Sequence, residues 1–209
     1  NGLGGSGRQA LDLIENGLGG SGKTIDGKTA IFDVITYNNL ELIRVLLNNG
    51  IDPNVLDNEG HTPLVLLVEE GLKLSNANDR EHFLERIVFL LKYRIRMDMI
   101  DKDGRTVFHK AVMAEDFEVV EKLLTKKADL NIKDKQGRTA LHHTQWKGNY
   151  KIARLLIAAG AKMDEPDYAG FTILNYAAIL GHVNLVVVLI ASGVLMYNKN
   201  KKSQAVKNF

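Results

Sequence analysis

The chain has 209 residues, of which 45% are hydrophobic and 25% are charged, as in an ordinary soluble protein of one or two domains. Its 27 basic residues nearly balance 25 acidic ones, so no global field favours nucleic acid or an anionic membrane. The absence of cysteine excludes disulfides, thiolate metal sites and a cysteine nucleophile. No apolar run reaches the roughly 20 residues of a membrane helix. We expect an intracellular protein, cytoplasmic or nuclear, with no membrane partner.

The first 24 residues contain one Gly/Ser-rich string twice. NGLGGSG stands at 1–7 and GLGGSG returns at 17–22, so the two copies bracket RQALDLIEN. Such strings are typical of flexible linkers. We therefore predict an engineered linker, peptide and linker over 1–24, a fusion in which RQALDLIEN is a tethered partner segment at an effective concentration of order millimolar. Its contact residues would be Leu11, Asp12, Leu13 and Ile14. In the alternative, RQALDLIEN is the remnant helix of a capping repeat.

The stretch 17–24, GLGGSGKT, also fits GxxxxGKT, the phosphate-binding loop of ATP- and GTP-hydrolysing proteins. Such a loop needs a buried strand before it and a helix after it. The flanking RQALDLIEN and TIDGKTAIF provide neither. Nucleotide binding, with Lys23 as its essential residue, is therefore the alternative function.

From residue 25 onward the chain repeats itself five times. IDGKTAIF, DNEGHTPL, DKDGRTVF, DKQGRTAL and DYAGFTIL each carry a glycine and, two residues later, a threonine. The glycine suits a turn with positive φ, and the threonine can cap a helix. The threonines lie 33, 44, 33 and 33 residues apart, so the second repeat holds an 11-residue insertion around LKLSNANDREHF: Thr29, Thr62, Thr106, Thr139 and Thr172. Each repeat is predicted to be a turn, a helix, a loop and a second helix.

This pattern resembles the ankyrin repeat over residues 25–197, most clearly in DNEGHTPL, NNGIDPN, GRTALHH, LLIAAGA and GHVNLVVVLIASG. The resemblance implies an all-α fold, a solenoid of stacked helix-loop-helix units with β-turn or hairpin fingers. It implies a structural role for His109 and His142, which would tie down the turns. It also implies a scaffold or adaptor that binds a protein or peptide in a concave groove.

The resemblance places the partner-binding positions on the finger tips and the first helices. Four basic residues there form a stripe beside large aromatic residues, and arginine and aromatic side chains are typical interface anchors. The expected partner is a peptide segment with aliphatic and acidic residues, such as RQALDLIEN. The predicted binding residues are Tyr37, His61, Lys102, Arg105, Lys110, Met113, Arg138, His143, Trp146, Lys147, Tyr168, Phe171 and Tyr176.

The sequence predicts no enzyme, cofactor, metal or nucleic-acid partner. His142 and His143 are adjacent and would point in different directions on a helix, and no histidine and acidic residues show the spacing of a helical metal site. No serine or cysteine stands in an elbow-like context. A purely structural spacer domain is the remaining alternative.

The last predicted helix is apolar from Val186 to Ile190, although a terminal repeat normally turns a polar face outward. We expect that face to be covered by a further element, by self-association or by the basic tail, 198–209.

Overall fold

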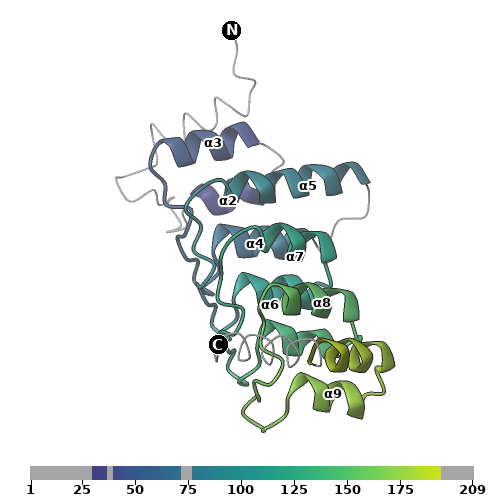
Figure 1. The fold of residues 1–209 in the computed structure, drawn as a ribbon. Coiled ribbons are helices and arrows are strands. Elements are labelled where there is room, and N and C mark those ends of the chain that lie inside the picture. Colours follow the sequence, from purple (N-terminus) through teal and green to yellow (C-terminus); the bar gives the residue numbers. More distant parts are fainter. Residues whose placement is uncertain (1–29, 37–39, 72–76, 194–209) are drawn as a thin grey trace, which may run out of the picture. The chain divides into compact units, whose positions relative to one another are not determined.

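The structure, a computed structural model, describes residues 30–36, 40–71 and 77–193 (Figure 1). Within these ranges the secondary structure is helices joined by turns, without strands, which confirms the predicted all-α fold. The predicted segments 1–24 and 198–209 lie outside the described residues, as does Tyr37. The elements are α2 (Ala30–Thr36), α3 (Leu40–Asn48), α4 (Pro63–Gly71), α5 (Ala77–Leu90), α6 (Val107–Met113), α7 (Phe117–Leu123), the 3₁₀ helix η1 (Ala140–Gln145), α8 (Tyr150–Ala158), α9 (Ile173–Ile179) and a helix at 183–193.

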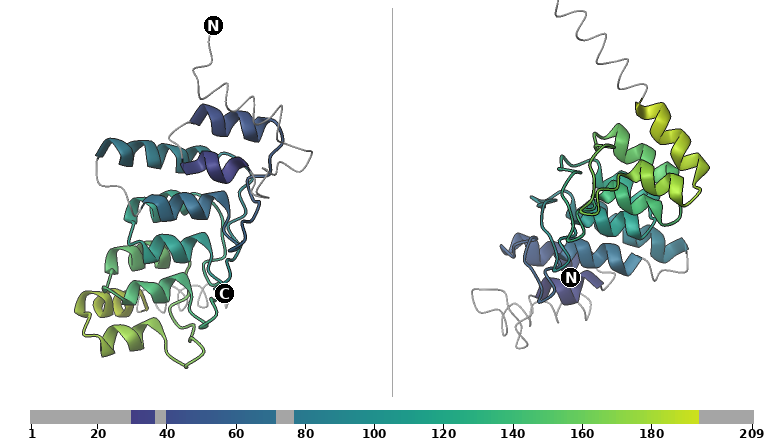
Figure 2. Two further views of the ribbon diagram at one scale, coloured as in Figure 1. Left: turned by 180° about the vertical axis from the view of Figure 1, so that it is seen from behind. Right: turned by 90° about the horizontal axis from the view of Figure 1, so that it is seen from below.

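The chain divides into two compact units, residues 1–102 and 103–209. In the first unit α2 packs against α3 and α4, and α4 packs against α5. In the second unit α6 packs against α7 and η1, and η1 also contacts α8 and α9 (Figure 2). Each unit is therefore built from successive helix pairs whose apolar faces bury one another, as the repeat pattern predicts. None of the described helices is both long and apolar enough to cross a membrane.

The helices of the second unit begin at the predicted threonines. Thr106 precedes α6, Thr139 precedes η1 and Thr172 precedes α9, each with extended backbone angles. The backbone N–H of Thr106 donates to Nδ1 of His109 at 3.1 Å, and Thr139 does the same to His142 at 3.1 Å. These reciprocal caps satisfy amide groups that a helix start leaves unpaired.

The same histidines also bind the turn that opens the next repeat. We call each such turn, from its aspartate to its threonine, a finger; residues 134–139 and 167–172 are two of them. Because their Nδ1 atoms accept from an amide, the proton lies on Nε2, which donates to a carbonyl oxygen. Nε2 of His109 is 3.0 Å from the carbonyl oxygen of Arg138, and Nε2 of His142 is 3.3 Å from that of Phe171. Each histidine therefore caps the helix of its own repeat and donates a hydrogen bond to the next repeat, which is the structural role that the resemblance implies.

The finger turns need glycine for reasons of space as well as conformation. Gly137 has a φ of 78°, and a Cβ at this position would lie 2.5 Å from the backbone nitrogen of Tyr168. An L-residue would therefore be strained and would push the next finger away.

The insertion of the second repeat lengthens its second helix. α5 has 14 residues, against nine in α3 and α8 and seven in α7. Phe83, Ile87 and Leu90 on α5 are fully buried. Arg86 is also buried, and its Nη1 donates to the carbonyl oxygen of Ile35 at 2.8 Å, near the end of α2. A cation is favourable at a helix C-terminus, so this contact ties α5 to α2.

Candidate functional site

Arg138, Trp146, Phe171 and Tyr176 come together in the second unit, and we call these four residues the Arg138 cluster. The guanidinium carbon of Arg138 lies 5.6 Å from the ring centre of Trp146 and 5.5 Å from that of Tyr176. The ring centres of Phe171 and Tyr176 are 5.3 Å apart. All four residues were predicted as binding residues, and the structure joins them into one stack of a cation and three rings.

Different elements supply the four side chains. Arg138 and Phe171 belong to successive fingers, Trp146 follows η1, and Tyr176 lies on α9. The cluster therefore exists only because two repeats stack against each other. Arginine over an aromatic face gains about 0.5–2 kcal/mol, depending on how well the pair is desolvated.

A buried carboxylate fixes the position of the cluster. Oδ2 of Asp167 accepts from the Tyr176 hydroxyl at 2.6 Å and lies 3.6 Å from Nε of Arg138. Its Oδ1 accepts from the backbone N–H of Ala169 and of Phe171, each at 3.0 Å. Burial opposes ionisation, but these hydrogen bonds hold the pKa of Asp167 below its usual value. The carboxylate therefore stays charged and orients both Tyr176 and Phe171.

The cluster presents large aromatic surface to solvent. Trp146 is 59% exposed, and the neighbouring finger residue Tyr168 is 73% exposed. Phe171 and Met113 are also exposed. Trp, Tyr and Arg are the residue types that dominate binding energy at protein interfaces. The second unit therefore displays, in a fixed arrangement, the chemistry of an interface anchor.

His143, which was predicted as a binding residue, is buried in the structure. Its side chain is 2% exposed, and Nε2 lies 2.9 Å from Oδ2 of Asp134. Oδ1 of Asp134 accepts from the backbone N–H of Gln136 and of Arg138, each at 2.9 Å. His143 thus anchors its own finger through Asp134.

Asp134 and Asp167 were not predicted as site residues. The signal was present in the sequence, because each aspartate opens a finger, in DKQGRT and DYAGFT, three residues before its glycine. His143 and Tyr176 each follow their aspartate by nine residues and play the same part. The nine-residue spacing could have predicted both pairs, His143 with Asp134 and Tyr176 with Asp167. That prediction also requires knowing that His143 and Tyr176 point toward their aspartates, which the sequence does not show.

Three buried side chains beneath the cluster have the composition of a metal site. His109, Asp134 and His143 each offer one ligand atom, and these atoms lie within 4.8 Å of one another. Both nitrogens of His109 already have hydrogen-bond partners, and Nε2 of His143 is bonded to Asp134. A metal ion bound by His109 would have to displace one of these hydrogen bonds, whereas Nδ1 of His143 has no hydrogen-bond partner. The arrangement is accounted for as a hydrogen-bonded support for the finger that carries Arg138.

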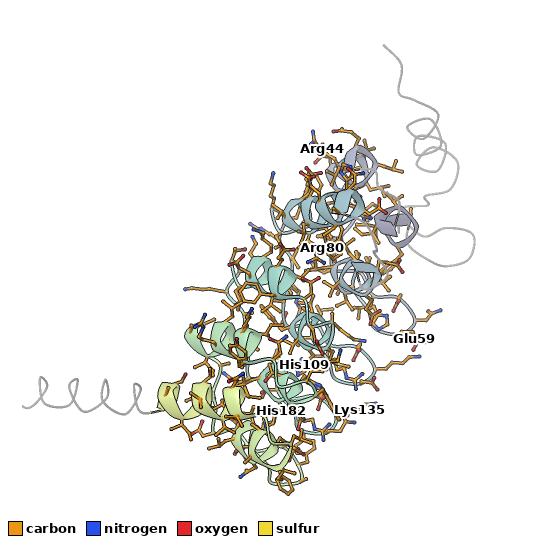
Figure 3. The ribbon with its side chains drawn as sticks, turned by 90° about the vertical axis from the view of Figure 1, so that its right-hand side faces the viewer. Arg44, Glu59, Arg80, His109, Lys135 and His182 are labelled. Atoms are coloured by element: carbon orange, nitrogen blue, oxygen red, sulfur yellow. The ribbon has the colours of Figure 1, made fainter. Side chains whose placement is uncertain are left out.

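Burial and hydrogen bonds set the charge states of His109, Asp134 and His143. Desolvation lowers the pKa of His109 to about 4 and also lowers the pKa of His143 below its usual value. Hydrogen bonds from Arg138 and Gln136 hold the pKa of Asp134 down against burial. At neutral pH the two histidines are therefore neutral and Asp134 is ionised. Figure 3 shows His109 among the helices and Lys135 on the finger side of the same unit.

The remaining predicted residues of the second unit do not form an unpaired basic stripe. Arg105 pairs with Asp103 at 3.0 Å, and Lys147 pairs with Glu115 at 3.2 Å. Lys110, on α6, is half-buried. The basic charge that the sequence suggests is thus offset by acidic neighbours, and the aromatic surface around Arg138 is the more distinctive feature.

In the first unit the two predicted finger residues have partners in the fingers. Nδ1 of His61 lies 3.3 Å from Asp57, and Nζ of Lys102 donates to Glu59 at 2.7 Å. The Lys102 pair is an exposed ion pair, a kind of contact that contributes little stability, whereas the His61 side chain is only 16% exposed.

Comparisons with known proteins identify the repeats. A model of ankyrin repeats in three copies matches residues 74–167 and 133–203, and a model of ankyrin repeats in many copies matches residues 13–66. A putative ankyrin repeat protein of Rickettsia felis is 31% identical over 104 residues, which cover 50% of this chain and 31% of the relative. An ankyrin repeat protein of variola virus is 32% identical over 95 residues, covering 46% of this chain and 15% of the relative. The chain thus spans less than a third of these relatives.

Proposed function

The chain belongs to the ankyrin repeat family, and on that premise we propose that its second unit binds a protein segment through the Arg138 cluster. Ankyrin repeats are typically protein interaction modules, and no catalytic domain was found among the matches. The observation that carries the proposal is the Arg138 guanidinium held between Trp146 and Tyr176 while the Trp146 ring remains largely in water.

The cluster suits a partner with aliphatic side chains and an acidic group. Aliphatic side chains would cover the exposed rings of Trp146 and Tyr168 and remove that apolar surface from water. A carboxylate would approach Arg138, although Asp167 already offsets part of the arginine charge. Because Asp167 holds the cluster in place before binding, little ordering entropy is lost on association.

A peptide-display selection against the whole chain tests this function. Peptides enriched on the native protein would be measured against Trp146→Ser and Arg138→Gln, with Phe117→Ser as the matched control, since Phe117 is an exposed aromatic residue on α7. We expect Trp146→Ser to weaken binding about 30-fold, as a hot-spot residue worth about 2 kcal/mol would. Phe117→Ser should leave the affinity unchanged. Enriched peptides that bind both cluster variants with native affinity would refute the proposal.

The family match also bears on the segment at the N-terminus. It begins at residue 13, inside the predicted tethered peptide, and it includes GLGGSGKT. The stretch ALDLIENG precedes IRVLLNNG by 33 residues, the spacing of the other repeats. Both observations support the alternative in which RQALDLIEN is part of a capping repeat, over a tethered ligand or a nucleotide-binding loop.

A further inference from the structure

The second helices of the first unit border an apolar groove. α3 and α5 line a space of about 450 Å³. Its apolar residues are Leu40 on α3 and Leu84, Val88 and Phe89 on α5. The guanidinium of Arg44 lies over the Phe89 ring, 5.6 Å from its centre, so α3 and α5 approach each other there. The groove is a different surface from the Arg138 cluster, on helices that the proposed function does not use.

Val88 makes this groove apolar at a position where the first, third and fourth repeats carry a charged residue and the fifth carries Val187. Offsets of 44 and 33 residues, the spacings of the repeats, align Val88 with Arg44, Glu121 and Arg154. Those three residues are exposed, as a charged residue on an outward position should be. Val88 is 40% exposed. The second repeat, like the fifth, therefore places an aliphatic side chain in water where three of the repeats have a charge.

The charged residues at the rim are segregated along the groove. Glu81 and Glu85 lie toward the start of α5, whereas Lys92 follows its end and Arg44 lies beside Phe89. All four of these side chains are exposed. From residue 81 to 92 the chain advances 11 positions, about 16 Å along a helix, or three turns. One end of the groove thus carries two acidic side chains and the other two basic ones, of which Arg44 also pairs with Glu41 at 3.5 Å.

We propose that the groove between α3 and α5 binds an amphipathic helix of about three turns from a protein partner. The aliphatic face of that helix packs on Leu84, Val88 and Phe89. A basic residue near one end pairs with Glu81 and Glu85, and an acidic residue near the other end pairs with Arg44 and Lys92. Charge complementarity sets the direction of the bound helix, and burial of aliphatic side chains provides the affinity.

Selection from a library of helical display peptides tests the groove. The native chain is the bait, and the enriched peptides are then measured on Val88→Arg and on the control Val187→Arg. Both positions hold exposed valines, and Val187 aligns with Arg154 in the preceding repeat. Arginine already occupies the aligned positions 44 and 154, so neither variant should disturb the fold. We expect a peptide class that loses at least tenfold in affinity on Val88→Arg and none on Val187→Arg.

Charge reversal gives the second readout. Arg44→Glu should weaken peptides with an acidic end at that position and select peptides that carry a basic residue there instead. If no helical peptide distinguishes Val88→Arg from the native chain, the proposal fails. It also fails if sedimentation shows that the native chain self-associates through the groove and Val88→Arg abolishes this, because a second copy would then be the occupant. Neither result affects the Arg138 cluster, which the Trp146 and Arg138 variants probe separately.

Discussion

Asp134 and Asp167 each hold the backbone of one finger and accept one hydrogen bond from a side chain nine residues later. The donor is His143 in one repeat and Tyr176 in the next. The two donors differ in chemistry, because the imidazole can gain a proton near neutral pH whereas the phenol cannot. The two fingers should therefore respond differently to acid.

His143→Tyr should make the stability of the second unit less dependent on pH. The folded state lowers the pKa of His143 by burial, so the unfolded chain binds more protons below about pH 6.5. The free energy of unfolding therefore falls as the pH falls from 6.5, and for His109 this continues to its folded pKa of about 4. Thermal unfolding midpoints measured between pH 7 and pH 4 should show a shallower slope in the variant.

The slope should not vanish, because His109 and His142 also have lowered pKa values. His82→Tyr, on an exposed part of α5, is the control variant. An unchanged slope in His143→Tyr, with the fold intact at pH 7, would mean that the His143 and Asp134 pair does not contribute to acid sensitivity.

The helix starts were predictable because each threonine and its glycine form a strong local signal, but the type of one helix was not. η1 is a 3₁₀ helix where α6 and α9 are α-helical. Its residues Thr144 and Gln145 align with the smaller Ala177 and Ala178 of the next repeat. The Thr144 hydroxyl donates to the Leu141 carbonyl oxygen at 2.8 Å, which competes with the backbone ladder of an α-helix. This competition depends on side-chain burial that the repeat pattern does not reveal.

Arg86 is the least expected residue of α5, because its aligned positions hold the aliphatic residues Leu42, Val119 and Ile152. Arg86→Ala should lower the free energy of unfolding of the first unit by about 2 kcal/mol, since it removes a charged hydrogen bond to Ile35 and leaves that carbonyl oxygen without this donor. Arg86→Leu should lower the free energy of unfolding by less than Arg86→Ala, because the leucine side chain still fills part of the buried space that Arg86 occupies.

Denaturant unfolding followed by circular dichroism measures both Arg86 variants, with Arg94→Ala as the control at an exposed arginine after α5. If Arg86→Ala unfolds at the same denaturant concentration as the native chain, the bond to Ile35 carries no stability.

For the whole molecule, the period of the repeats predicted the fold class and the family. All four members of the Arg138 cluster come from the finger and first-helix positions that the sequence singled out, and their role in binding stays a prediction. The sequence could not show that Arg138 and Tyr176, 38 residues apart, share one carboxylate. Nor could it show that His143 turns inward while Trp146 turns outward, since both belong to the same short segment. Those distinctions depend on the register between stacked repeats and on which partners lie beneath.

Trp146 is the chain's one tryptophan and is 59% exposed, so its fluorescence tests the central claim most directly. A peptide enriched on the native chain and sensitive to Arg138→Gln would be titrated in, and Mg-ATP would be titrated separately. We predict a saturable blue shift of the emission with the peptide, as the ring leaves water, and no shift with Mg-ATP. Peptide binding that leaves the emission unchanged, or a shift produced by Mg-ATP and abolished by Lys23→Ala, would contradict the account.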